Sequence, residues 1–392
     1  MLNIALFSEC YHPMRNGVVV SVASFARVLT ELGHHVTIFT VRHPDQVGAE
    51  DGVIRFPSIT FPMRVRYPLA IPIATGAARR LLAEVPFDVV HSHSPMLMGH
   101  AAISYARRKR LPLVFTYHTL IEEYSHYVPL PQHWVKRRAV HLSRYYCNTA
   151  DHVIAPTRHV AERLRRYQVT KPISIIPTGI DIDLFDLVPD RDLRALYQIP
   201  ADVPLLAYAG RIAKEKNIPR VLTMFRDVLR REPDTHLLLL GGGPYEQPIR
   251  ELIDQLGIGH RTRMTGFVTR EQIVQGLRGA DLFVFASHTE TQGLVLGEAM
   301  ACATPVVAVS ADAPRELLDD GVEGYLVPDE DGPFAEAVLT LVRDRALCQS
   351  LGRNARARAD AVSAHRCTAE LVKVYEQEIS YRHPPRRPLL PL

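Results

Sequence analysis

A strand–loop–helix–strand unit in the second half of the chain constrains the fold most. Leu282 to Ala286 is a short apolar run with the length of a buried strand, Gly293 to Cys302 favours a short helix, and Thr304 to Val309 is another buried strand. Short buried strands that alternate with helices are typical of α/β proteins with parallel sheets. The polar loop at 287–292 leads to the helix N-terminus, where unpaired N–H groups and the helix dipole favour an anion such as phosphate.

Two carboxylates frame this helix N-terminus. Glu290 lies in the loop, and Glu298 shares a helix face with Leu294 and Val295, which precede it by four and three residues. Glu298 is the only charged residue within 293–309. A carboxylate in so apolar a segment needs hydrogen-bond donors, and sugar and ribose hydroxyls are suitable ones. The alternative is an exposed Glu on an otherwise buried helix, but the second acid and the helix start favour a ligand site.

A pair of cations follows another apolar run. Pro204 to Ala209 reads as a strand, and Arg211 and Lys216 come between its end and the next helix. Two cations at such a point suit a pyrophosphate, because Arg grips it with two N–H groups and Lys adds a point charge. The alternative is a charged turn that only contacts water.

The same alternation of strand and helix runs through both halves of the chain. Strands are predicted at 3–8, 35–41, 87–91, 112–116, 152–156, 173–177, 204–209, 236–240, 263–268, 282–286 and 304–309. Helices are predicted at 18–32, 96–110, 133–146, 158–167, 293–302 and 364–381, with another that ends near residue 231. The first strand, helix and strand form a β-α-β unit of Rossmann type.

Two residues of the first half lie where an open α/β sheet binds ligands. His118 follows the strand at 112–116, and ligands lie beyond the C-terminal ends of such strands. Gly17 stands at the start of the first helix, where its N–H can approach a phosphate. The alternatives are a structural histidine and a plain turn glycine.

The helix at 133–146 is basic and amphipathic. Its apolar residues fall on one face at helical spacing: Val135, Ala139, Leu142 and Tyr146. Lys136, Arg137 and Arg138 add positive charge, and Trp134, the only tryptophan, lies at the start. A helix of this kind can lie on anionic lipid. The alternative is an ordinary helix that packs one face on its domain.

Composition narrows the class of protein. A chain of 392 residues favours two domains, and 47% apolar with 22% charged residues is typical of a soluble globular protein. No run approaches the roughly 18–20 apolar residues of a membrane span. The N-terminus has no basic lead and enters a strand directly, so we expect no secretion signal.

The spacing of the cysteines favours a cytoplasmic protein, and neither the cysteines nor the histidines form a metal-binding motif. The five cysteines lie far apart without a CxxC pair, as expected in a reducing compartment, and the eighteen histidines contain no HExxH pattern. We therefore predict no metal and no cofactor. The formal net charge of +4 is too small to indicate a nucleic-acid partner.

The central segment also resembles a known family. Glu290 and Glu298 match the E-x7-E motif of retaining glycosyltransferases of family 4, and the flanking sequence from Gly293 to Ala308 is similar to that family throughout. Gln292 departs from the family, which usually has an aromatic residue there. The resemblance implies that the first Glu contacts the donor sugar and the second the nucleotide ribose. It also implies that the amides of the residues between them hold the sugar and phosphates.

Other segments extend the resemblance over almost the whole chain. Gly210-Arg211-x4-Lys216 is similar to the family's donor-phosphate site, and Gly17 matches a glycine that faces the donor phosphates. The segment from Thr116 to Tyr127 most closely resembles that of diacylglycerol α-glucosyltransferases. In these enzymes the residue that matches His118 sits beside the transferred sugar, so the resemblance implies that role.

The resemblance implies a GT-B architecture, with two Rossmann-like domains facing a central cleft. We expect an acceptor-binding domain at 1–180, a nucleotide-sugar-binding domain at 181–363, a helix at 364–382 that crosses back to the first domain, and a Pro-rich tail at 383–392. An apolar loop at 61–68 with two Arg is typical of an acceptor or interface loop.

The implied activity is the transfer of a hexose from a nucleotide-sugar, UDP-glucose, to a membrane lipid such as diacylglycerol. Arg211, Lys216 and the amides of Leu294 and Val295 would stabilise charge on the leaving diphosphate. The expected location is the cytoplasm, at the anionic inner face of the cell membrane. The alternatives are an α-mannosyltransferase that uses GDP-mannose on a phosphoinositide or polyprenyl-linked glycan, a nucleotide-sugar 2-epimerase, and a non-catalytic binding protein.

Overall fold

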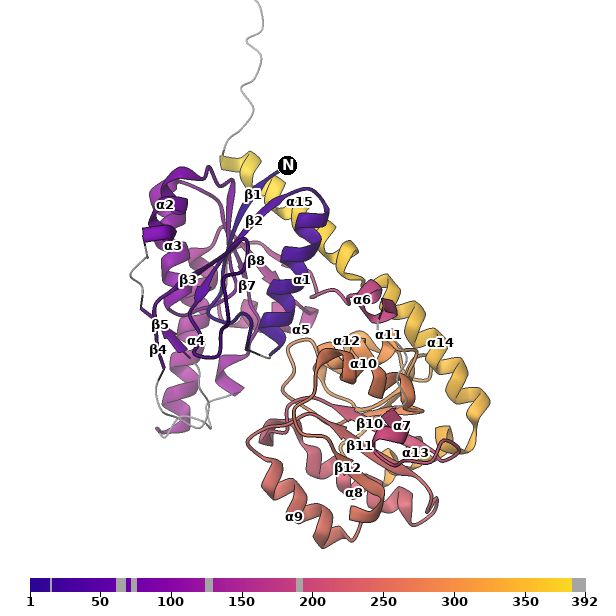
Figure 1. Cartoon of the computed structure of the whole chain (residues 1–392). Helices are drawn as coiled ribbons and strands as arrows, with labels where there is room; N and C mark the ends of the chain where they lie inside the picture. Colours follow the sequence, from indigo (N-terminus) through magenta and orange to yellow (C-terminus); the bar gives the residue numbers. More distant parts are fainter. Residues whose placement is uncertain (15, 61–67, 72–75, 124–129, 188–192, 383–392) are drawn as a thin grey trace, which may run out of the picture. The chain divides into compact units, whose positions relative to one another are not determined.

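The computed structural model divides the chain into two units (Figure 1). One unit contains residues 1–179 and 364–392, and the other contains residues 180–363. The structure describes residues 1–14, 16–60, 68–71, 76–123, 130–187 and 193–382. The predicted tail at 383–392 lies outside the described residues, and so does the predicted loop at 61–68 apart from its last residue.

The first unit is built on a seven-stranded parallel sheet with the order β3-β2-β1-β6-β7-β8-β9. Its strands are β1 (Asn3–Phe7), β2 (His35–Val41), β3 (Val53–Phe56), β6 (Val89–Ser92), β7 (Leu113–Thr116), β8 (His152–Ala155) and β9 (Ile173–Ile175). The chain builds outward from β1 to β3 and then returns to β6 on the other side of β1. This reversal makes the C-terminal ends of β1 and β6 a topological switch point, where open sheets of this kind bind ligands.

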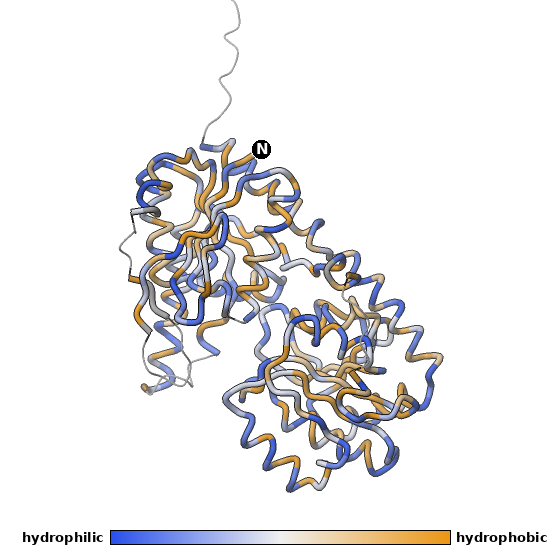
Figure 2. Tube along the Cα trace, in the orientation of Figure 1, coloured by the Kyte–Doolittle hydropathy of each residue, from blue (hydrophilic) through white to orange (hydrophobic). Residues whose placement is uncertain are grey.

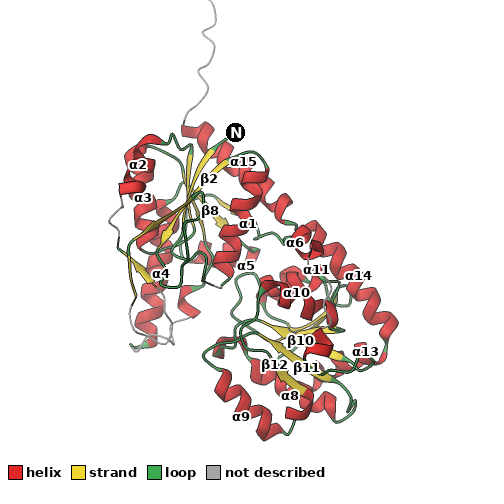
Figure 3. Cartoon of the chain, viewed as in Figure 1, coloured by secondary structure: helices red, strands yellow, loops and turns green. Residues whose placement is uncertain are grey.

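Helices cover both faces of the first sheet (Figure 3). They are α1 (Gly17–Glu31), α2 (Gly76–Glu84), α3 (Leu97–Lys109), α4 (Gln132–Thr149), α5 (Arg158–Arg166) and α15 (Ala364–Arg382), beside a hairpin of β4 (Ser58–Thr60) and β5 (Pro68–Ala70). Side chains along β1 alternate between the faces. Ile4 and Leu6 pack with α1 and α15, whereas Ala5 and Phe7 pack with α3 and its neighbours. Burial on both faces explains why the strands read as continuous apolar runs.

The second unit repeats this plan with a six-stranded parallel sheet, in the order β12-β11-β10-β13-β14-β15. Its strands are β10 (Leu205–Ala209), β11 (His236–Leu240), β12 (Thr262–Met264), β13 (Leu282–Phe285), β14 (Val306–Val309) and β15 (Gly324–Val327). Its helices are α6 (Ile182–Leu187), α7 (Leu193–Leu196), η2 (Lys214–Lys216), α8 (Ile218–Leu229), α9 (Glu246–Leu256), η3 (Gly259–Arg261), α10 (Arg270–Gly279), α11 (Leu294–Ala301), α12 (Asp312–Leu317), α13 (Asp331–Arg343) and α14 (Arg345–Ala361). Its switch point lies between β10 and β13.

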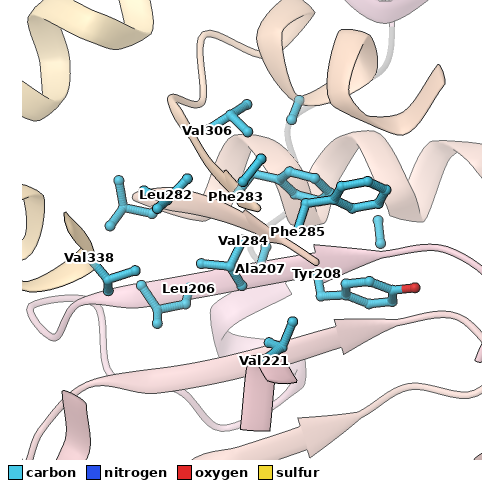
Figure 4. Packing of buried hydrophobic residues seen from close by; sticks show 14 of the residues in the cluster. Leu206, Ala207, Tyr208, Val221, Leu282, Phe283, Val284, Phe285, Val306 and Val338 are labelled. Atoms are coloured by element: carbon cyan, nitrogen blue, oxygen red, sulfur yellow. The ribbon is translucent and has the colours of Figure 1, made fainter. Parts of the chain in front are cut away.

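The core of the second unit is formed by its central strands. Figure 4 shows Tyr208 of β10 beside Phe283 and Phe285 of β13, and the rings of Tyr208 and Phe285 stack with centroids 6.5 Å apart. Figure 2 shows the strands as apolar stretches, with hydrophilic residues on the outer helices. This rigid sheet fixes where the loops after β10 and β13 begin.

Every predicted strand and helix is present, with ends shifted by a few residues. The strand predicted at 263–268 is wrong at its C-terminal end, because β12 stops at Met264 and Gly266 takes a left-handed conformation with φ +68°. In the first unit the prediction missed β3, the hairpin and α2, and in the second it missed α6, α7, α10, α12 and β15. None of the helices in the described part of the chain is long and apolar enough to cross a membrane.

Candidate functional site

Three predicted site residues of the second unit meet at its switch point. Arg211 follows β10, Lys216 ends η2, and Glu290 lies in the loop after β13. Because β10 and β13 are adjacent parallel strands, both loops leave the same edge of the sheet. Lys216 Nζ forms a salt bridge with Glu290 Oε1, and both side chains are mostly buried, at 17% and 16% exposure. The structure thus joins residues that are far apart in the sequence.

A glycine-rich turn holds the backbone around Arg211. Ile212 N donates to Gly242 O at 3.0 Å, and Tyr245 N donates back to Ile212 O at 3.0 Å. A Cβ atom on Gly243 would lie 2.3 Å from Ile212 O, so the two loops approach too closely for any side chain there. The turn after β11 therefore fixes the position of the arginine-bearing loop after β10.

The guanidinium of Arg211 is itself oriented by a buried acid. Arg211 Nη2 forms a salt bridge with Glu215 Oε1, and the Glu215 side chain is only 3% exposed. Ser287, which follows β13, donates from Oγ to Glu215 O at 3.3 Å. The side chain of Arg211 is 36% exposed, so part of it remains accessible to a ligand.

The N-terminus of α11 has the backbone geometry expected of an anion site. Gly293 caps the helix in a left-handed conformation with φ +75°, and a Cβ there would lie 2.9 Å from Leu296 Cδ1. Leu294 and Val295 form the first turn, and N–H groups in the first turn of a helix have no carbonyl partner within it. The dipole of α11 adds to their preference for negative charge.

Glu298 has a protein partner that the sequence analysis missed. Arg270 Nη1 lies 3.0 Å from Glu298 Oε1, with the two side chains 34% and 13% exposed. The guanidinium of Arg270 also lies 5.2 Å above the ring of Phe185. A capping box at Thr269 marks the start of α10, but nothing in the local sequence indicates that α10 meets α11. Arg270 therefore supplies one of the hydrogen-bond donors that the Glu298 carboxylate needs, and the binding of a ribose by Glu298 stays a prediction.

In the first unit, His118 belongs to a row of stacked histidines. His93 Nδ1 and His118 Nε2 are 2.9 Å apart, and the rings of His91 and His93 have centroids 4.1 Å apart. His91 is held by Tyr375 Oη at 2.6 Å and Thr116 Oγ1 at 2.7 Å. Burial lowers the pKa of His91 to about 3, that of His118 to about 4, and that of His93 well below its ordinary value. His118 is therefore neutral at pH 7 and acts as a hydrogen-bonding group rather than a cation.

A cavity of about 250 Å³ lies against His118. It opens where the loops after β1, β6 and β7 leave the sheet, which is the switch point of the first unit. Its walls are formed by Glu9, Cys10, Val18, His93, Ser94, Pro95, Met96, Phe115, Tyr117, His118 and Thr119. The sequence analysis placed His118 beyond a strand end but did not recognise Glu9 or His93.

The remaining predicted residues, Gly17 and the basic group with Trp134 on α4, are exposed. Gly17 is the first residue of α1, whose N-terminus is capped by Asn16 Oδ1 accepting from Val19 N at 3.0 Å. On α4, Lys136, Arg137 and Arg138 are exposed, and Trp134 is 66% exposed. The opposite face of α4 is buried through Ala139, Ser143, Tyr146 and Cys147. Among the residues that the structure describes, no group of three or more His, Cys, Asp and Glu could hold a metal ion.

Comparison with known proteins identifies relatives along both units. Residues 15–184 match the sequence model of a family described as Glycosyltransferase Family 4, and residues 190–358 match one described as Glycosyl transferases group 1. The chain is 31% identical to an alpha-monoglucosyldiacylglycerol synthase of Streptococcus pneumoniae, over 86% of this chain and 78% of the relative. It is also 31% identical to a D-inositol 3-phosphate glycosyltransferase of Xylanimonas cellulosilytica, over 93% of each.

Solved structures match nearly the full length. Sucrose-phosphate synthase from Thermosynechococcus elongatus has a TM-score of 0.77 and 23% identity, over 97% of this chain and 100% of that one. Anabaena HepE in complex with UDP and glucose has a TM-score of 0.75 and 20% identity, over 96% and 100%. These likenesses confirm the predicted α/β fold of GT-B type, built from two Rossmann-like units.

Proposed function

Because the chain belongs to glycosyltransferase family 4, we propose that it moves a hexose from a nucleotide-sugar to a membrane lipid with retention of anomeric configuration. That the chain is a glycosyltransferase follows from the family. The observation that carries the proposal is the cluster of Arg211, Lys216 and Glu290 at the switch point of the second unit. It combines two cations for a diphosphate with a carboxylate for sugar hydroxyls.

The proposed chemistry relies on charge stabilisation by groups that are already in place. Arg211, Lys216 and the first N–H groups of α11 would take the negative charge that develops on the leaving diphosphate. Lys216 would exchange part of its interaction with Glu290 for the phosphate, which leaves Glu290 able to hold the sugar. Glu298, held by Arg270, would bind the ribose.

For the first unit, the proposed roles are those that the family resemblance implies. Neutral His118 would hydrogen-bond the transferred sugar, and the N–H of Gly17 would approach the donor phosphates. The reaction needs no metal in this account, because the two cations and the helix dipole stabilise the leaving group.

We propose UDP-glucose as donor and diacylglycerol as acceptor. Relatives named alpha-monoglucosyldiacylglycerol synthase, at 31% and 29% identity, support this choice. The exposed basic face of α4 with Trp134 supports binding at the anionic inner face of the cell membrane. A second candidate is transfer to an inositol phosphate or a phosphoinositide, with GDP-mannose as a candidate donor in the panel below. A relative named D-inositol 3-phosphate glycosyltransferase, which is also 31% identical, supports it.

A donor and acceptor panel tests the proposal. The purified protein is incubated with radiolabelled UDP-glucose, UDP-galactose, GDP-mannose or UDP-N-acetylglucosamine, each with diacylglycerol in anionic micelles, with inositol phosphate, or without acceptor. Label in the organic phase from UDP-glucose supports the proposal. Label only on inositol phosphate would favour the second candidate, and conversion of the nucleotide-sugar without acceptor would favour an epimerase.

Membrane binding is tested by charge reversal on α4. Reversal of Lys136, Arg137 and Arg138 to Glu should weaken binding to anionic vesicles by more than 100-fold, since each basic residue contributes about 1 kcal/mol near such a surface. The control reverses three exposed arginines of α14 and α15: Arg345, Arg353 and Arg366. Equal loss of binding in both variants would show a general charge effect and would contradict the role of α4.

A further inference from the structure

Two residues that line the cavity of the first unit each carry a buried polar atom without a partner among the described residues. Glu9 is 9% exposed and His93 is 2% exposed. Among the described residues, neither Glu9 Oε2 nor His93 Nε2 has a hydrogen-bond partner. Both residues line the cavity of about 250 Å³ beside His118. Buried polar groups are nearly always satisfied, so two of them on residues of one cavity wall favour a site for a polar ligand.

The Glu9 carboxyl group interacts with the backbone of Leu97 and Met98, which lowers its pKa, but burial has the larger effect and raises it. Glu9 Oε1 accepts from Met98 N at 3.2 Å, at the N-terminus of α3. A glutamine would supply the contact of Oε1 with Met98 equally well, whereas Oε2 has no hydrogen-bond partner among the described residues. A buried carboxylate without a partner is costly in free energy. The same burial raises the pKa of Glu9 to about 7. Such a carboxyl in a cavity is typical of a functional site.

The position and size of the cavity indicate what it binds. Glu9 follows β1, His93 follows β6, and His118 follows β7, so they surround the switch point of the first sheet. A volume of about 250 Å³ is below the roughly 300–1,000 Å³ of sites for whole drug-sized ligands. Apolar walls such as Met96 and Phe115 suit a short carbon skeleton, and the polar atoms suit hydroxyl or ester oxygens.

We propose that this cavity binds the glycerol end of the lipid acceptor and that Glu9 Oε2 accepts a hydrogen bond from its hydroxyl group. His93 Nε2 takes a neighbouring oxygen of the same glycerol. The inference rests on the proposed function, since it names the acceptor site of that reaction. It adds Glu9 and His93 to the acceptor-binding residues, beside His118.

The test compares Glu9→Gln with Glu84→Gln at pH 8. Glu84 is an exposed carboxylate at the end of α2, remote from the cavity lining. At pH 8 the Glu9 carboxylate accepts a hydrogen bond, whereas the NH₂ group of a glutamine in that position only donates. The other described titratable groups around Glu9 stay neutral at that pH, because burial lowers the pKa of the histidines and raises that of the thiol and phenols: Cys10, His93, Tyr117, His118 and Tyr146.

The first readout is binding of dihexanoylglycerol to the full-length protein by saturation-transfer NMR, without donor. Glu9→Gln should bind about 10-fold more weakly than wild type, and Glu84→Gln should match wild type. Val18→Phe, which fills the cavity from α1, should weaken binding without changing Glu9. Tighter binding of dihexanoylglycerol than of free glycerol supports a glycerolipid as the ligand. Equal binding of the two overturns the assignment to a lipid.

The second readout separates acceptor from donor effects. Glu9→Gln should raise the KM for diacylglycerol about 10-fold, whereas Glu84→Gln should leave both this KM and the acceptor-independent release of UDP unchanged. Equal binding of dihexanoylglycerol by wild type, Glu9→Gln and Val18→Phe would overturn the inference. It would also be overturned if Glu9→Gln lost acceptor-independent UDP release as strongly as it lost transfer to diacylglycerol. If wild type binds the glyceride through Glu9 but transfers no hexose to it, the proposed function fails while the binding site stands.

Discussion

At the residue scale, the charges of the candidate site in the second unit form ion pairs with side chains of opposite sign. Each predicted donor-binding charge has a protein partner of opposite sign: Arg211 with Glu215, Lys216 with Glu290, and Glu298 with Arg270. A buried ion pair costs desolvation energy, so such pairs are weak evidence for stability. In the proposed reaction they would hold each side chain in place, which would reduce the ordering needed in the transition state.

Glu9 gives a pH-dependent prediction. Burial raises its pKa from 4.5 to about 7, so the folded state holds a proton that the unfolded state loses between these values. Its contribution to stability is fully present below pH 4.5, falls as pH rises, and is lost above pH 7, by at most about 3 kcal/mol. Glu9→Gln removes this loss, so its stability relative to wild type should increase between pH 5 and pH 8.

Denaturant unfolding at the two pH values measures this difference. Glu84→Gln is the matched control, because Glu84 is exposed and its variant should follow wild type at both pH values. A constant difference between Glu9→Gln and wild type from pH 5 to pH 8 would mean that the carboxyl group is already ionised at pH 5.

At the element scale, the glycine turn after β11 acts as a support for the loop after β10. In Gly243→Ala the new Cβ would lie 2.3 Å from Ile212 O, and backbone must shift to make room. Overpacking of this kind costs about 1–3 kcal/mol, and the shift moves Arg211. We expect both a lower free energy of unfolding and a higher KM for the nucleotide-sugar.

A second glycine provides the control for this substitution. A Cβ added to Gly332 in α13 would meet no atom within 4 Å. Gly332→Ala should therefore change the free energy of unfolding by no more than about 0.5 kcal/mol and leave the KM for the nucleotide-sugar unchanged. Wild-type kinetics in Gly243→Ala would show that the turn does not position Arg211.

The last helix, α15, is tied to the first sheet by a buried hydrogen bond. Tyr375 donates to or accepts from His91 Nδ1 at 2.6 Å, and Tyr375 is fully buried. Tyr375→Phe leaves the histidine nitrogen without its partner, which should cost about 1–3 kcal/mol. Tyr381→Phe on the same helix is the control, because Tyr381 is 71% exposed. Equal thermal unfolding of both variants would contradict this account of how α15 is held.

At the scale of the whole molecule, the sequence was most informative where local patterns determine structure. The short apolar strands predicted both parallel sheets, since such strands must be buried on both faces. The positions of Arg211, Lys216 and Glu290 just after strands predicted a ligand edge. Adjacency of β10 and β13 then brings these residues together.

Features that depend on packing between distant elements could not be predicted. The contact of Arg270 with Glu298 arises because α10 packs beside α11, and no local pattern encodes that. Glu9 has no motif, and its place in the cavity wall emerges only because β6 and β7 bring His93 and His118 to the same cavity. The strand β3 was missed because only Phe56 of its residues is buried, which leaves a weak apolar pattern.

The measurement that tests the central claim most directly is transfer of radiolabelled hexose from UDP-glucose into diacylglycerol by wild type and Lys216→Met. We predict lipid-phase label with wild type and a loss of about 100-fold or more in Lys216→Met, because the substitution removes one of the cations that would stabilise the leaving diphosphate. Arg366→Ala, an exposed change on α15, should retain wild-type transfer. Equal transfer by wild type and Lys216→Met would contradict the assignment of the donor site.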